Sequence, residues 1–363
     1  MKKFLPLLLF VLTVPVAAQT AVRPEVDLHF HWAMVNNEFD ASSQVLAPSL
    51  TLAAVRFSPY IGLRFGEHHR LKGGISVIRD FGTPGEPLQT ELAVWYQLDR
   101  KGLRAAAGIF PRALLQGPYS TAILSDKQRY YDALLEGCLL QWNQDRFGCE
   151  LALDWNGKKG AERREQFNFI TAGQARLNEW LSLQWEGMLH HYACSFEVQG
   201  VVDDILLHPY VGMDWGPRSG WERLAIEAGV MAGYHCDRIR GERHTPIGAD
   251  IVTELRKWGA GLRNEAYYGG SQAPFYGKAD QAGLPYADQL YMRNSLWQIT
   301  PDGHPGFYDR CDLYWMPPAG KHVKLRLCFT AHFGHGGFLG HQEILEAVVQ
   351  LDRLCFKKKK TIS

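Results

Sequence analysis

The stretch KHVKLRLCFTAHF, residues Lys321–Phe333, alternates between two kinds of side chain. From Val323 onward every second residue is apolar, and Lys, Arg, Cys, Thr and His fill the positions between them. A period of two is that of a β-strand, whose successive side chains point to opposite faces. One face of this strand therefore needs an apolar neighbour and the other needs water. The apolar neighbour is either a protein core or lipid.

The same alternation recurs along the chain between turn-forming residues. Further apolar files begin at Thr90, Leu103, Phe147, Ile205, Leu224 and Leu345. Short connections such as DRKG and GPRSG largely alternate with long ones such as PRALLQGPYSTAILSDKQ and GHGGFLGHQE. An up-and-down barrel in an outer membrane has this pattern, with short periplasmic turns and longer outer loops. After Gln19 no apolar stretch is long enough for a membrane-spanning helix.

The strand count depends on the segment Ala249–Gly269. Read as two short strands joined by the turn KWGAG (Lys257–Gly261), it places the long connection Gly269–Pro305 on the outer side. The count is then about 16 strands, with 14 to 18 as the range, and both chain ends are periplasmic. Read as one strand, the segment breaks the alternation unless Gln289–Thr300 supplies another strand. We therefore expect an all-β fold, a single transmembrane antiparallel up-and-down β-barrel.

The strands of a soluble β-sandwich would show the same alternation, so the prediction that the apolar faces contact lipid needs further evidence. The strands follow one another without helices or Greek-key-length links, and aromatic residues recur near their ends. Interfacial girdles of membrane barrels need such aromatic residues. The aromatic positions are Trp95, Tyr96, Trp142, Trp155, Trp180, Trp215, Trp221 and Trp315. We expect the apolar faces to contact lipid.

The N-terminus predicts export. Residues 1–18 combine a basic start, an apolar run and small residues at Val16–Ala18, as in a cleaved signal peptide. Residues 19–363 then form the barrel, and a retained anchor is the alternative reading. The formal charge of +1 gives no overall positive potential that would attract nucleic acid. The seven scattered Cys residues indicate neither a disulfide framework nor a zinc site. The tetralysine near the C-terminus reads as a solvated tail.

Several stretches resemble porin-like outer-membrane barrels of the uncharacterised kind common in Bacteroides-type bacteria. The matching stretches are AAGIFPR (Ala106–Arg112), LALDWNGKKGAERREQF (Leu151–Phe167), ILLHPYVGMDW (Ile205–Trp215), LRNEAYYGG (Leu262–Gly270) and YDRCDLYW (Tyr308–Trp315). The resemblance implies an outer-membrane location and a porin-like role, and it carries over no catalytic residues. We therefore expect passive diffusion of small hydrophilic solutes. The expected partners are outer-membrane lipid, lipopolysaccharide, those solutes, and other copies of the chain or other outer-membrane proteins.

Two basic clusters in long loops are candidates for pore-mouth charge that favours anionic solutes. They comprise Lys158, Lys159, Arg163 and Arg164 in one loop, and Arg238, Arg240, Arg243 and the neighbouring His244 in another. Binding to lipopolysaccharide phosphates, or plain solvation, is the alternative reading. Aromatic residues of Gly269–Pro305 are candidates for a constriction loop or a sugar-stacking surface, namely Tyr276, Tyr286, Tyr291 and Trp297.

Catalytic chemistry has weaker support, so we expect no enzyme, cofactor or metal site. His29 and His31 lie on one strand face and lack a third metal ligand. Ser195 follows His190 and His191, but no GxSxG motif surrounds it. Asp203 and Asp204 read as solvated loop carboxylates rather than a calcium site. A barrel hydrolase using His190 or His191, and a non-conducting scaffold barrel, are the alternatives to a porin.

Overall fold

The computed structural model describes residues 22–40, 47–299 and 304–354, so the expected signal peptide and tetralysine tail lie outside the described residues. Sixteen strands form the wall. They are β1 (Arg23–Phe39), β2 (Leu50–Phe65), β3 (His69–Asp80), β4 (Gln89–Arg100), β5 (Leu103–Pro111), β6 (Leu134–Asn143), β7 (Phe147–Gly157), β8 (Gln166–Arg176), β9 (Leu181–Tyr192), β10 (Val202–Asp214), β11 (Arg223–Asp237), β13 (Ile247–Lys257), β14 (Ala260–Gly269), β15 (Gly306–Trp315), β16 (Val323–Gly334) and β17 (Gly337–Leu354).

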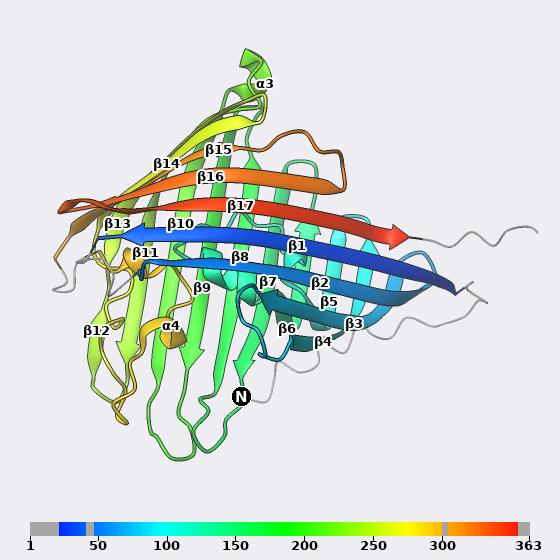
Figure 1. Ribbon diagram of the computed structural model, residues 1–363. Coiled ribbons are helices and arrows are strands. Elements are labelled where there is room, and N and C mark those ends of the chain that lie inside the picture. Colours follow the sequence, from blue (N-terminus) through cyan, green and yellow to red (C-terminus); the bar gives the residue numbers. More distant parts are fainter. Residues whose placement is uncertain (1–21, 41–46, 300–303, 355–363) are drawn as a thin grey trace, which may run out of the picture.

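The sheet closes on itself between the first and the last strand. β1 pairs antiparallel with β17 in a register that places Met34 opposite Leu345 (Figure 1, where blue meets red). Every other wall strand pairs antiparallel with its sequence neighbour, and the three-residue β12 (Glu242–His244) lies within the connection from β11 to β13. The prediction of a single antiparallel barrel with 16 wall strands is confirmed.

As expected, most long connections lie at one end of the barrel and most short turns lie at the other. We call these the loop end and the short-turn end. The turn predicted in KWGAG joins β13 to β14, where Trp258 has φ 54° and Gly259 has φ 76°. Two consecutive positive φ angles are those of the tight turns that suit antiparallel strands. The loop end carries the longer connections with one exception, which corrects the expectation for GHGGFLGHQE. There β17 begins at Gly337, whose φ of 104° allows a two-residue turn after β16.

The two faces of β16 answer the question raised by its alternation. Leu327 and Phe329 are more than 40% exposed on the outside, whereas Thr330 and His332 are buried toward the lumen. Outward-facing Trp142, Trp221, Trp258 and Trp315 gather near the short turns, as an interfacial girdle requires. Trp95 departs from this expectation, because it points into the lumen and is buried. No helix among the described residues has the length and apolar character to cross a membrane.

Two connections fold into the lumen, and we call residues 112–133 and 270–299 together the inner plug. They carry four of the short helices: η1 (Arg112–Leu114), α2 (Asp126–Tyr131), α4 (Ala287–Leu290) and η2 (Ser295–Trp297). α3 (Gly216–Ser219) lies in a turn at the other end. Trp297 is completely buried, its ring meets lumen-facing Tyr267 and Tyr308 edge-on, and its Nε1 donates to Thr121 Oγ1 at 3.2 Å. The two halves of the plug are thus joined to each other and to the wall.

An ion pair fixes the first half of the plug to the opposite wall. Arg310 on β15 donates from Nη1 to Asp126 Oδ2 of α2 at 2.9 Å. Burial opposes ionisation of Asp126, but the charges of Arg310 and Arg129 outweigh it and lower the pKa of the carboxyl to about 2. The ion pair therefore persists throughout the physiological pH range.

Leu151→Arg tests which face of the wall meets lipid. Leu151 is exposed on the outside of β7, midway between Phe147 and Trp155. An arginine at the bilayer midplane of a barrel costs about 2–4 kcal/mol, so the free energy of unfolding from lipid vesicles should fall by that amount. Leu177→Arg in the β8–β9 turn is the control, with an expected cost of about 0–1 kcal/mol near the interface. Equal losses for both variants would contradict the lipid-facing assignment.

Candidate functional site

Two doublets of polar residues lie side by side on β9 and β10. In each doublet one side chain faces the lumen and the next faces outward, because strand neighbours point to opposite faces. His190 and Asp204 face inward and are buried, whereas His191 and Asp203 face outward and are partly exposed. The strand register sets His191 opposite Asp203 and His190 opposite Asp204. The wall thus carries a His–Asp pair on each face at the same height.

The inward pair holds the second half of the inner plug. Asp204 accepts from Nη2 of Arg293 with both carboxylate oxygens, at 2.8 and 2.6 Å. His235 on β11 places its Nδ1 3.0 Å from the same carboxylate, and His190 bonds to Asn168 on β8. Asp204, His235 and Arg293 are all essentially inaccessible to solvent. This cluster therefore fixes the plug rather than binding a solute.

The outward pair, which we call the outer dyad, consists of His191 and Asp203. His191 Nδ1 lies 2.8 Å from Asp203 Oδ1. Arg238 directs Nε and Nη2 at the other oxygen of Asp203, at 2.7 and 2.6 Å. Phe167 on β8 stacks on the imidazole with 4.9 Å between ring centroids. The histidine is thereby fixed in orientation on the outer surface of the wall.

The hydrogen bond to Asp203 also fixes the chemistry of the ring. A carboxylate accepts only, so neutral His191 carries its proton on Nδ1 and leaves a lone pair on Nε2. Within the described part of the chain, Nε2 of His191 has no hydrogen-bond partner. A histidine oriented by a carboxylate, with a free ring nitrogen, is the arrangement of a general base.

The height of the outer dyad matches the loop-side edge of the apolar band. Ten residues separate Leu181, at the short-turn end of β9, from His191. This is ~33 Å along a strand and about 25 Å along the axis of a barrel whose strands tilt by ~40°. The apolar band of outer-membrane barrels has about this height. Trp155 and Phe167, stacked beside the dyad, supply the aromatic residues expected at that interface.

The predicted pore-mouth cations differ in their burial and in their partners. Arg164 is buried against Asp280, whereas Lys159 contacts Cys194 Sγ at 3.1 Å. Arg240 bonds to the carbonyl of Ala279. Lys158, Arg163 and Arg243 are exposed, and Arg238 contacts Asp203 of the outer dyad. Anion selection by these residues stays a prediction.

The predicted constriction residues all lie in the inner plug. Tyr286 donates to Asp237 Oδ2 at 2.8 Å, the Tyr291 hydroxyl accepts from the Phe275 amide, and Tyr276 donates to Asp288. Tyr286, Tyr291 and Trp297 are buried, and Tyr276 is partly buried. Their role as a constriction or sugar-stacking surface stays a prediction.

The other catalytic or metal-binding candidates from the sequence make contacts within the protein. Ser195 is buried, and its Oγ accepts from the amides of Glu197 and Val198 in a local turn. His29 pairs with Asp352 and His31 with Glu346, across β1 and β17. No group of three or more His, Cys, Asp or Glu among the described residues is arranged to hold a metal ion. The expectation that Asp203 and Asp204 lie in a loop is wrong, because both belong to β10.

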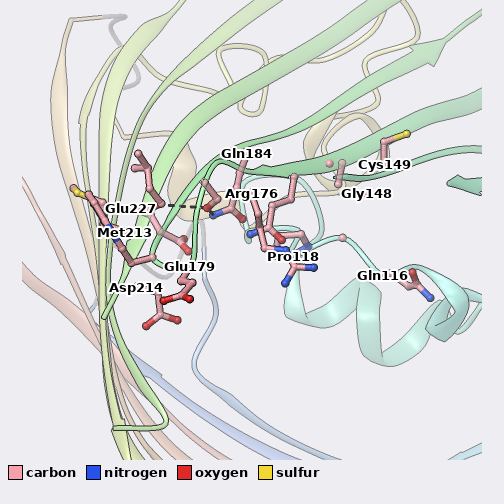
Figure 2. Close-up of a pocket in the computed structure, with 18 of the residues that line it drawn as sticks. Gln116, Pro118, Gly148, Cys149, Arg176, Glu179, Gln184, Met213, Asp214 and Glu227 are labelled. Carbon is pink, nitrogen blue, oxygen red and sulfur yellow. Dashed lines mark hydrogen bonds between the residues drawn. The ribbon is translucent and has the colours of Figure 1, made fainter. Parts of the chain in front are cut away.

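A cavity of about 560 Å³ occupies the lumen at the short-turn end, and we call it the vestibule. Figure 2 shows Glu227, Met213 and Asp214 on one side of it and Gln116, Gly148 and Cys149 on the other. Trp180 of the β8–β9 turn and Pro217 of α3 also line it, whereas Gln116–Pro118 of the inner plug form its far end. The vestibule therefore reaches from the short-turn end to the plug.

Comparison with solved structures shows the fold. The chain is similar to a loop-deletion mutant of OmpT, an outer membrane protein of Vibrio cholerae, with 9% identity, a TM-score of 0.54, and coverage of 91% of this chain and 100% of that one. Pseudomonas aeruginosa OccK11 (OpdR) gives 11% identity and a TM-score of 0.49 over 91% of this chain and 96% of that one. OccK8 (OprE) of the same organism gives 10% identity and a TM-score of 0.44 over 91% of this chain and 98% of that one. The likeness to the OmpT mutant shows the barrel fold of outer-membrane proteins.

The family comparison refines the resemblance and corrects one expectation. No curated protein matches the chain. The model of the lipid A 3'-O-deacylase-type family matches residues 22–212, more than half of the chain and all of β1–β9. The expectation that the chain is not an enzyme is therefore wrong, because the family is named for an enzymatic reaction. The outer dyad lies within the matched segment. The chain belongs to the lipid A 3'-O-deacylase-type family.

Proposed function

We propose that the protein is an outer-membrane ester hydrolase, which removes an acyl chain from an outer-leaflet glycolipid of the lipid A type. The family match supports the reaction class. The observation that carries the site assignment is the outward orientation of His191, at the height where acyl chains join their headgroups. A lipid diffusing in the outer leaflet reaches this face of the wall without entering the lumen.

The reaction needs one general base and one water molecule. Nε2 of His191 takes a proton from water, whose oxygen attacks the ester carbonyl to give a tetrahedral intermediate. The intermediate expels the sugar alkoxide, which receives that proton back from Nε2. The products are a fatty acid and a sugar hydroxyl. Asp203 stabilises the imidazolium that forms in between, and Arg238 keeps Asp203 in place.

Cations around the outer dyad suit an anionic headgroup. Arg243 on β12 is exposed and lies opposite Cys236, which in turn lies opposite Asp203. Lys159 lies in the loop before β8, and its Nζ stands 5.4 Å from the Phe196 ring centroid. Both positively charged side chains belong to loops beside the dyad, where they attract phosphate groups of the glycolipid.

His191→Asn tests the proposed base. The amide of asparagine cannot take up the proton, so fatty-acid release from purified lipid A should fall by about 10²–10⁴-fold, the contribution of a general base. Mass spectrometry of the detergent-solubilised protein with lipid A measures the released acid. His341→Asn is the matched control, because His341 also lies on the loop side, stacks on a phenylalanine and pairs with a carboxylate. Unchanged release by the His191 variant would refute the assignment.

Single-channel conductance separates the hydrolase from passive diffusion, which stays a prediction of the sequence. We expect the refolded chain to show no stable open steps, because the inner plug is bound to the wall through Asp204 and Arg293. Arg293→Ala removes the contact between the plug and the Asp204 carboxylate, which keeps only His235 as a partner among the described residues, and should produce intermittent openings. Arg238→Ala, which frees the adjacent Asp203 on the outer face, is the control and should remain closed. Stable open steps of the unaltered chain would favour diffusion.

A further inference from the structure

A second, smaller cavity lies in the lumen beside the vestibule. Its volume is about 20 Å³, enough for one water-sized group. Pro118 and Glu227 line both cavities. Its other lining residues are Ser120, Glu186, His208, Tyr210, Asp250, Val252, Arg263 and Glu265. We call this cavity the acceptor pocket, for the atoms that face it.

The first acceptor is a ring nitrogen of His208. Its Nδ1 lies 3.0 Å from Glu186 Oε1, and Glu186 also accepts from the amide and hydroxyl of Ser120 at 2.7 and 2.6 Å. Because this carboxylate only accepts, the neutral His208 ring carries its proton on Nδ1 and presents a lone pair at Nε2. His208 is 4% exposed, and its Nε2 has no hydrogen-bond partner among the described residues.

The other two acceptors are carboxylate oxygens. Asp250 is 2% and Glu265 1% exposed, and Oδ1 of Asp250 and Oε1 of Glu265 have no hydrogen-bond partner in the described chain. Arg263 Nη1 neutralises the other oxygen of Glu265 at 2.7 Å. Among the described residues, Asp250 forms no ion pair with Lys or Arg; its Oδ2 lies 3.4 Å from His208 Nε2, which forms an ion pair with it only when the imidazole is protonated. The pocket therefore holds one carboxylate whose ion-pair partner within the described chain is a histidine alone.

We propose that the acceptor pocket binds the primary ammonium group of a small amine that enters through the vestibule. Three acceptors around a water-sized space match the three N–H donors of such a group. Its single positive charge neutralises Asp250. Water supplies two donors and no charge, so it would leave the buried carboxylate with His208 as its single basic partner among the residues described.

The vestibule suits the remainder of such a ligand. It offers about 560 Å³ between the acceptor pocket and the short-turn end of the barrel, with Trp180 among its lining residues. An alkyl chain attached to the ammonium group would extend past Pro118 and Glu227 into that space. The site lies inside the wall, whereas the outer dyad faces lipid, so the proposal does not rest on the proposed hydrolysis.

Calorimetric titration of the detergent-solubilised full chain with n-butylamine tests the proposal. We expect saturable one-to-one binding of the amine and no binding of tetramethylammonium, which has the same charge and no N–H donor. Asp250→Asn should weaken butylamine binding at least tenfold. Asp352→Asn is the control, because Asp352 is an exposed carboxylate that pairs with His29 and lines neither cavity, so the affinity of this variant for butylamine should be unchanged.

Three results would overturn the proposal: no butylamine binding by the unaltered chain, equal binding of tetramethylammonium, or full affinity in the Asp250 variant. Heat-modifiable migration on gels reports whether each variant forms the barrel. If Asp250→Asn does not fold, Glu265→Gln serves in its place, with the same expected loss of affinity and the same contradicting result.

Discussion

The pairing of β1 with β17 is the interaction on which the rest of the structure depends. In lipid every backbone amide and carbonyl needs a partner within the protein, and only a closed sheet satisfies all of its strands. Thirteen register pairs join the two strands, so no edge remains at the seam. Closure also gives every strand an inside and an outside. The side-chain chemistry of the whole chain then divides between lumen and lipid.

This division explains how adjacent, chemically identical residues have different roles. His190 and Asp204 help to hold the inner plug, whereas His191 and Asp203 form the outer dyad one residue away. A general diffusion pore places its chemistry in the lumen. Here the lumen holds plug segments with buried aromatic and ion-pair contacts, and an oriented histidine faces the lipid instead. The arrangement suits a substrate that is itself a component of the membrane.

The sequence predicted the wall well because the wall is periodic. Alternation assigned the lipid face of β16, and two glycines marked the β13–β14 turn on which the strand count depended. Periodicity also implies that His190 and His191 face opposite sides. Predicting the outer dyad would have required the register between β9 and β10, which depends on how the intervening loop folds. Neither the register nor the loop conformation follows from a period of two.

The inner plug could not be predicted from the sequence either, because its contacts do not follow from the period of two. Arg293 and Asp204 are separated by 89 positions, and Arg293 lies in a segment without alternation. The basic loop residues were likewise recognised by type, but Arg164 and Arg238 pair with Asp280 and Asp203, which come from other parts of the chain. Long-range ion pairs of this kind are set by tertiary packing, so clusters in sequence did not become clusters in space.

Photo-crosslinking in the outer membrane tests most directly whether the site faces its lipid. p-Benzoylphenylalanine in place of Phe167 would stand beside His191 on the outer face, and in place of Tyr192 it would stand in the lumen. The account predicts crosslinks to lipopolysaccharide from position 167 and none from position 192. Absence of lipopolysaccharide at position 167, or equal labelling at both, would contradict it.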